Sequence, residues 1–148
     1  MQLSADLREF IELLNSRGVD YLIVGAHTVA FHGKPRFTGD LDILVRPAPD
    51  NAVKLAEVLK QFGFGPAQFT ETDFLEEEQL IQLGRVPHRI DLLTSISGVP
   101  NDEAFATRVS GEIDNLPVSI LSKALLIRNK RAVGRPQDMA DLKLLEGD

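Results

Sequence analysis

Residues 24–43 read VGAHTVAFHGKPRFTGDLDI and carry the most informative spacing in the chain. Asp40 and Asp42 are separated by one apolar residue within a predicted strand. Because strand side chains alternate between faces, the two carboxylates share one face, about 7 Å apart, while Leu41 and Ile43 face the core. Two carboxylates so placed repel each other unless a cation lies between them. The pair therefore favours a hard divalent ion such as Mg²⁺.

A third acid, Asp91, lies in the apolar stretch RIDLLT at Arg89–Thr94. An unpaired carboxylate is costly in apolar surroundings. If this strand lies beside the strand of Asp40 and Asp42, three acids converge on one point. Such a triad can hold two divalent ions, one activating an attacking hydroxyl and the other stabilising the leaving oxygen. Taken alone, the Asp-x-Asp pair also fits a structural or solvated pair, and Asp91 also fits a hydrogen-bonded structural acid.

Around these acids the hydrophobic pattern predicts alternating helices and strands. The predicted elements are a helix over 7–14 with Ser4 as its cap, strands over 21–24 and 41–45, a helix over 26–31, a helix capped by Asp50 and ended by Gly63, a hairpin of strands 79–83 and 89–93, a helix over 102–109, a strand over 118–121, and helices from 122 onward with a break at Gly134-Arg-Pro136. We therefore expect an α/β (α+β) fold, with a small mixed β-sheet flanked by helices and a short helical C-terminal cap. A single domain is expected over 1–148, with its core at about 19–121 and the C-terminal helical segment at about 122–148.

The composition is that of an ordinary globular protein. With 148 residues, 43% hydrophobic and 26% charged, the chain is not disordered throughout. It has no cysteine, which excludes a disulfide scaffold, a thiolate metal site and a cysteine nucleophile. No apolar run approaches the roughly 20 residues that span a bilayer, and the N-terminus lacks a signal-peptide pattern. We expect a cytoplasmic protein with no membrane partner.

Charge is unevenly distributed along the chain. The net charge of −6 argues against a general nucleic-acid binder. Residues 122–137 contain five basic residues and no acid, whereas residues 71–78 contain five acids and no base. Opposite poles on one small protein fit a local anionic ligand better than a long polyanion. Two solvated faces are the alternative interpretation.

These motifs resemble the nucleotidyltransferases of the DNA polymerase β superfamily. The superfamily pattern, hG[GS], a spacer and Dh[DE]h, is similar to Val24-Gly25-Ala26, 13 residues and Asp40-Leu-Asp42-Ile. The chain is most similar to the minimal nucleotidyltransferases and the abortive-infection-type nucleotidyltransferase toxins, over about 21–145. Their motifs HGxxRxTxDxD, RIDLLT and K…GRxxDxxDL correspond to His32, Gly33, Arg36, Thr38, Asp40 and Asp42; to Arg89–Thr94; and to Lys123 or Lys130, Gly134, Arg135, Asp138, Asp141 and Leu142.

The resemblance implies transfer of an NMP group from an NTP to an acceptor hydroxyl by two-metal catalysis. It implies that Asp40, Asp42 and Asp91 are catalytic and hold Mg²⁺ or Mn²⁺, with Asp91 as general base. The nucleotide phosphates would be bound by Gly25, Ala26, Arg36, Thr38, Lys123 and Lys130, and Asp138 and Asp141 would support the site. The chain departs from the family at Ala26, where Gly or Ser is usual, and at Ser122, where the toxins have an acid. Backbone amides at a helix N-terminus can still bind phosphate beside an alanine, but the serine hydroxyl is lost.

Several alternatives remain open. The donor is an NTP such as ATP, and the acceptor is a tRNA, a protein or a small molecule. The resemblance suggests the toxin of a toxin–antitoxin pair, with a partner protein or a homodimer completing the cleft. The alternative function is a catalytically silent nucleotide-binding or interaction module of the same fold, to which Ala26 points. The histidines at 27, 32 and 88 do not share one helical face, which favours structural or substrate-edge roles over a zinc site.

Overall fold

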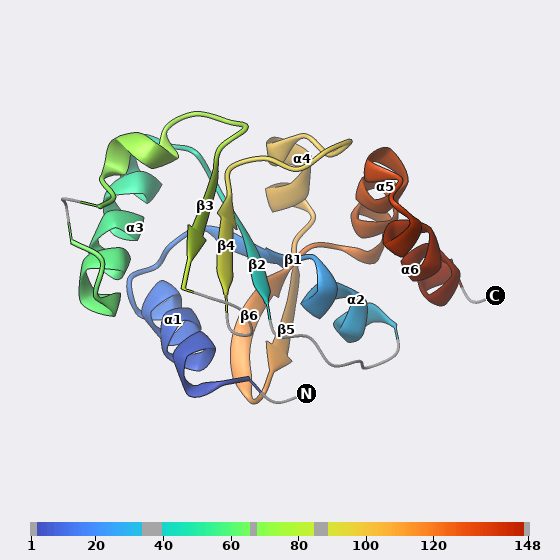
Figure 1. The fold of residues 1–148 in the computed structure, drawn as a ribbon, viewed down its shortest axis with the longest axis horizontal. Coiled ribbons are helices and arrows are strands. Elements are labelled where there is room, and N and C mark those ends of the chain that lie inside the picture. The colour runs from blue at the N-terminus through green and yellow to red at the C-terminus, as the bar shows by residue number, and fades with distance from the viewer. Residues whose placement is uncertain (1–2, 34–39, 66–67, 85–88, 147–148) are drawn as a thin grey trace.

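A six-stranded mixed sheet forms the centre of the computed structural model, which describes residues 3–33, 40–65, 68–84 and 89–146 (Figure 1). The strands are β1 (Tyr21–Val24), β2 (Leu41–Val45), β3 (Leu80–Leu83), β4 (Ile90–Leu93), β5 (Val109–Ile113) and β6 (Leu116–Ile120). Their order across the sheet is β3-β4-β2-β1-β6-β5. The pairs β2–β4 and β1–β6 are parallel, and the other pairs are antiparallel. The predicted mixed sheet and the predicted β3–β4 pairing are confirmed.

Helices cover both faces of the sheet. They are α1 (Ala5–Ser16), α2 (Ala26–His32), α3 (Pro49–Phe62), α4 (Asn101–Ala106), α5 (Lys123–Val133) and α6 (Pro136–Glu146), with a 3₁₀ turn η1 at Glu71–Phe74. In Figure 1, α1 and α3 lie on one side of the sheet, and α2, α4, α5 and α6 lie on the other. Among the described residues, no helix is long and apolar enough to cross a membrane.

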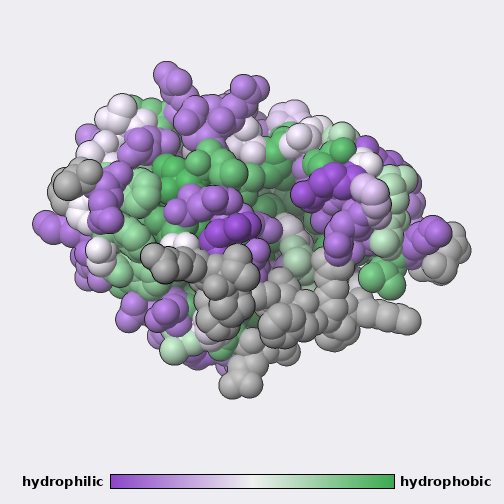
Figure 2. Space-filling model, in the orientation of Figure 1, coloured by the Kyte–Doolittle hydropathy of each residue, from purple (hydrophilic) through white to green (hydrophobic). Residues whose placement is uncertain are grey.

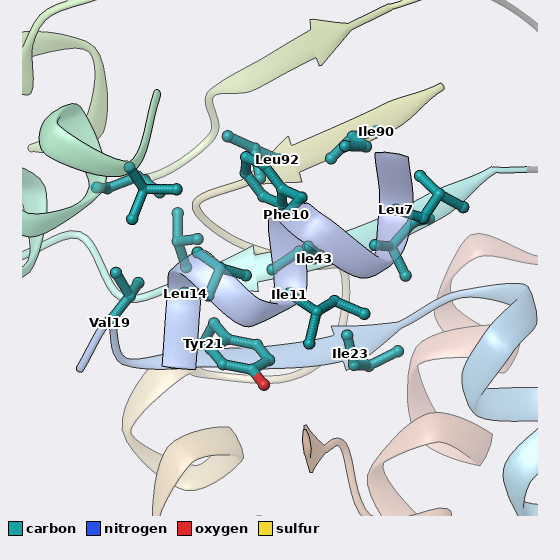
Figure 3. Close-up of a cluster of buried hydrophobic side chains, with 14 of the residues drawn as sticks. Leu7, Phe10, Ile11, Leu14, Val19, Tyr21, Ile23, Ile43, Ile90 and Leu92 are labelled. Carbon is teal, nitrogen blue, oxygen red and sulfur yellow. The ribbon is translucent and has the colours of Figure 1, made fainter. Parts of the chain in front are cut away.

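The larger apolar core lies between the sheet and the pair α1 and α3 (Figure 3). The Ser4 side chain caps α1 by accepting from the Leu7 amide, as predicted. The helical spacing of the α1 apolar residues then turns Leu7, Phe10 and Leu14 toward the strands. Phe10 meets the Phe62 ring of α3 edge to face, with centroids 5.0 Å apart. This packing fixes the strand faces, so that alternate residues must point to the opposite side of the sheet.

The second face of the sheet is only partly covered. Leu22, Val24 and Leu44 are buried there among residues of α2, α4, α5 and α6. Asp91 and Leu93 point to the same face, because the intervening Leu92 belongs to the first core. Over β3 and β4 this face opens into a pocket, described below.

Strand β5 is absent from the sequence-based prediction, which placed a helix over 102–109. In the structure α4 ends at Ala106, and β5 forms a hairpin with β6. The two-residue turn Asp114-Asn115 has φ of 52° and 64°, as the favoured two-residue hairpin turns require. Gly111 weakens the strand signal of β5. A Cβ there would lie 2.7 Å from the Phe31 ring, so a larger residue would require that ring to move.

The predicted start of α3 is also wrong, whereas the C-terminal break is confirmed. The N-cap of α3 is Ala48, Pro49 follows, and Asp50 lies in the first turn, where its charge favours the helix dipole. Helix α5 ends at Gly134, with φ of 70°, and α6 begins at Pro136.

Candidate active site

A pocket of about 440 Å³ opens over the strands β2 and β4. Because the two strands are parallel neighbours, Asp42 and Asp91 lie directly opposite each other. Asp40, immediately before β2, also lines the pocket. The fold therefore brings the three acids singled out by the sequence to one place.

Arg89 supplies positive charge to these acids. Its Nε and Nη2 donate to Oδ1 and Oδ2 of Asp91 at 2.9 and 3.3 Å. Its Nη2 also lies 3.5 Å from Oδ2 of Asp40. Sequence reasoning did not select Arg89 as a site residue. The available signal was its position two residues before Asp91, which places both side chains on one face of the strand.

Asp42 retains an unfavourable environment despite Arg89. Burial, the charge of Asp91 and a hydrogen bond with Asp91 raise the pKa of Asp42 to about 6, and the charge of Asp40 adds to the effect. A hydrogen bond between two carboxyl groups requires one of them to be protonated. A cation held between the two carboxylates would relieve this repulsion.

Gly25 makes room for the Asp42 carboxylate. A Cβ on Gly25 would overlap Oδ2 of Asp42 and lie 2.9 Å from its Cγ. Gly25 also has φ of 70°, which L-residues rarely adopt. It caps α2, and its carbonyl accepts from the amides of Thr28 and Val29. The turn Gly25-Ala26 thus places the start of α2 directly against Asp42.

A buried ion cluster lies beside the acids, between α5 and α6. Lys130 Nζ is 3.1 Å from Oδ1 of Asp138 and 3.1 Å from Oδ2 of Asp141, and its side chain is only 7% exposed. Arg135 Nε donates to Oδ2 of Asp138 at 2.8 Å. Hydrogen bonding from Arg135, joined by Lys130, lowers the pKa of Asp138 to about 2. Asp138 and Asp141 are both buried, so they do not form a pair on an exposed helix face.

The basic stretch 122–137 is largely paired with acids of the same chain. Besides Lys130 and Arg135, Arg128 pairs with Glu103, and Arg131 pairs with Glu146. Lys123 is exposed in the first turn of α5 and is not among the residues that line the pocket. Of the two lysines predicted to reach phosphate, only Lys130 lines the pocket, and two carboxylates surround it.

The described histidines have structural surroundings. His27 is buried, and burial lowers its pKa to about 4, so the ring is neutral. It hydrogen-bonds the backbone of Asp40. A ring nitrogen of His32 lies 2.8 Å from the Leu121 carbonyl oxygen. The predicted site residues Arg36 and Thr38, and also His88, lie outside the described residues.

The donor chemistry of the pocket suits a hard divalent ion, because three carboxylates repel one another there. Within the part of the chain that the structure describes, however, no three acidic or histidine side chains surround a common point. Two of the acids are directed at Arg89 instead. Binding an ion between the carboxylates would therefore require Arg89 to release Asp91.

Replacing Asp42 by Asn tests the repulsion. Because the pKa of Asp42 is raised from 3.8 to about 6, its ionisation costs stability as the pH rises through this range. Asp42→Asn should therefore stabilise the metal-free protein at pH 7.5, by about 2 kcal/mol, and the gain should vanish near pH 4. Urea unfolding at both pH values measures this. The exposed Glu9→Gln is the control, and an equal gain at both pH values would contradict the explanation.

Gly25→Ala tests the contact between the turn and Asp42. We compare it with Gly18→Ala, where φ is 67° but nothing lies within 4 Å of the added Cβ. Gly18→Ala should cost about 1 to 2 kcal/mol from backbone strain alone. Gly25→Ala should cost clearly more, because Asp42 must move. Equal losses in the free energy of unfolding would show that Asp42 does not constrain this turn.

The buried ion cluster predicts a contrast between two lysines of α5. Lys130→Ala leaves Asp138 and Asp141 buried without their lysine, and it should lower the free energy of unfolding by about 3 to 5 kcal/mol. Lys123→Ala, at an exposed position of the same helix, should change it by less than about 0.5 kcal/mol. Chemical denaturation at pH 7 compares them, and similar small effects would refute the structural role of Lys130.

Comparisons with known proteins were made for sequence and for structure. No protein-family model and no curated protein sequence matches the chain. Among solved structures, a proposed nucleotidyltransferase from Thermotoga maritima is similar, with a TM-score of 0.62 and 16% identity over 93% of this chain and 88% of its own. The lincosamide antibiotic adenylyltransferase LnuA, bound to lincomycin, gives a TM-score of 0.58 and 14% identity over 99% of each chain.

A third similar structure is an antigenic nucleotidyltransferase-like protein from Paracoccidioides brasiliensis. Its TM-score is 0.55, with 18% identity over 97% of this chain and 76% of its own. At such low identities the likeness establishes the fold, and all three structures point to the same one. The chain has the nucleotidyltransferase fold.

Proposed function

We propose that the protein is a nucleotidyltransferase that moves an NMP group from an NTP to an acceptor hydroxyl. The observation that carries the proposal is the register of β2 and β4, which sets Asp42 opposite Asp91, with Asp40 beside them, in the pocket of a nucleotidyltransferase fold. The raised pKa of Asp42 supports it, because crowded acids of this kind are typical of functional sites.

The three carboxylates are the proposed ligands of Mg²⁺ or Mn²⁺. When bound, such ions lower the pKa of an attacking hydroxyl and stabilise the negative charge of the leaving pyrophosphate. Arg89 neutralises the acids in the metal-free protein, which keeps them together without a permanent ion. Asp91 is the proposed general base and would take the proton of the acceptor hydroxyl once Arg89 has turned away.

The turn at Gly25 and Ala26 is the proposed cradle for the nucleotide phosphates. It lies against Asp42, so a phosphate bound there would be next to the proposed metal ligands. The hydrogen bond to Asp138 raises the pKa of Arg135, and the charge of Asp42 adds a smaller contribution, so Arg135 lies near the proposed metal ligands. Lys130, Arg36 and Thr38 stay predicted phosphate contacts, and Lys123 stays one from the resemblance alone. Asp138 and Asp141 would support the site by holding Lys130 and Arg135.

ATP is the first donor to test, because one similar structure is an adenylyltransferase. That protein was solved with an antibiotic, which also makes a small-molecule acceptor a natural candidate. A role as the toxin of a toxin–antitoxin pair, a homodimer or partner protein, and a cytoplasmic location stay predictions from the sequence. A silent nucleotide-binding module is the second candidate, which Ala26 favours because this side chain offers no hydroxyl to a phosphate.

Calorimetric titration of ATP, GTP, CTP and UTP, with Mg²⁺ and with EDTA, tests the proposal. Wild type should bind at least one nucleotide only with Mg²⁺, and Asp40→Asn/Asp42→Asn should weaken binding about tenfold or more, because it removes two charged ligands. Glu9→Gln is the control for a change of charge elsewhere.

The outcomes separate the candidates. Mg²⁺-dependent binding followed by pyrophosphate release in the presence of acceptor candidates supports the transferase. Nucleotide binding without pyrophosphate release, in wild type and in the Ala26→Ser variant alike, supports the silent module. Failure of folded wild type to bind any nucleotide would refute both.

A further inference from the structure

One wall of the pocket is apolar. It consists of Leu80 and Leu93 on β3 and β4, Ile96 in the following loop, and Val133 at the end of α5. Leu80 is 56% exposed and Val133 is 40% exposed, which is high for side chains of this kind. Figure 2 shows a hydrophobic area between the β3–β4 strands and α5, bordered by hydrophilic atoms. Exposed apolar surface inside a pocket favours a ligand that covers it.

Acidic residues adjoin this wall. Glu76, Glu77 and Glu78 lie just before β3, separated from it by Gln79, and are exposed. The Glu78 amide donates to Oγ of Ser95 at 2.8 Å, and Ser95 itself lines the pocket. Glu78 is held with φ of 64°, so this contact fixes the acidic segment against the pocket loop. Among the described residues, none of these three side chains pairs with a cation.

The basic residues of the pocket are already engaged. In the described part of the chain, Arg89 pairs with Asp91, and both Lys130 and Arg135 pair with Asp138. Four acids and three bases line the pocket. The three glutamates are not part of this lining, and the bond of the Glu78 amide to Ser95 places their segment beside it. A polyanionic acceptor would meet like charge there, whereas a cation would be attracted.

Taken together, these features define the acceptor. We propose that the apolar wall and the acidic segment 76–78 bind a small cationic acceptor with an apolar face, and that this molecule carries the reacting hydroxyl, an assignment of its role that rests on the proposed function. The pocket of about 440 Å³ is within the usual size range of sites for single small molecules.

Two probes of similar size and opposite charge test the proposal on the full chain without nucleotide. Benzyltrimethylammonium and phenylacetate are titrated while backbone amide shifts are followed by NMR. The cation should bind with shifts at 80, 93 and 95–97, about tenfold more tightly than the anion. Leu80→Gln and the triple variant Glu76→Gln/Glu77→Gln/Glu78→Gln should each weaken it about fivefold. Their controls, Val53→Gln and Glu9→Gln, alter exposed residues elsewhere and should have no effect.

Three results would overturn the proposal. They are equal binding of phenylacetate, cation binding that neither variant weakens, and tighter binding of total tRNA than of the cation at 0.15 M salt. Mg·ATP is titrated in parallel. If Leu80→Gln weakened the binding of Mg·ATP but not the binding of the cation, the apolar wall would contact the nucleobase instead. The proposal would then also be refuted. If Mg·ATP did not bind at all while the cation bound as expected, the cation site would stand and the proposed function would fail.

Discussion

The repulsion between Asp42 and Asp91 is the constraint on which the site depends. Parallel pairing of β2 and β4 sets the two carboxylates opposite each other, and packing of the intervening apolar residues against α1 and α3 prevents either from turning away. The protein offsets part of this cost with Arg89, and the rest is reflected in the pKa of Asp42, which is raised to about 6. Under the proposed function, a divalent cation would take over from Arg89 and relieve the remaining repulsion. The repulsion between the carboxylates and the proposed metal chemistry therefore both follow from the pairing of β2 with β4.

The surroundings of the acids serve the same constraint. Gly25 lets α2 begin directly against Asp42, and a larger residue would displace that carboxylate. On the other side, the buried pairs of Lys130 with Asp138 and Asp141 tie α5 to α6. Buried ion pairs contribute little net stability, yet breaking one is costly, so the cluster fixes a geometry more than it strengthens the fold. Its effect is to hold Arg135 at the edge of the pocket.

Much of this arrangement was predictable from the sequence. Three local patterns were sufficient for part of it. The spacing of Asp40 and Asp42 and the apolar strand around Asp91 predicted two strands of the sheet and the three acids. The break at Gly134-Arg-Pro136 predicted the two last helices. The rest depends on contacts distant in sequence. The bond of Arg89 to Asp91 could have been read from their spacing, but its ion pair with Asp40 exists only when β2 and β4 pair. β5 was missed because Gly111 weakens its strand pattern, and the close approach of Gly111 to the Phe31 ring of α2 is a contact distant in sequence. Lys123 and Lys130 could not be separated, because burial distinguishes them and helical spacing alone does not.

We propose that Asp40, Asp42 and Asp91 exchange Arg89 for a divalent cation when nucleotide binds. Anomalous scattering from crystals grown with Mn²⁺ and a non-hydrolysable ATP analogue measures this directly. We expect a manganese peak in contact with oxygens of these carboxylates and of the analogue, with Arg89 turned away from Asp91. A bound analogue with Arg89 still paired to Asp91, and no manganese between the carboxylates, would contradict the account.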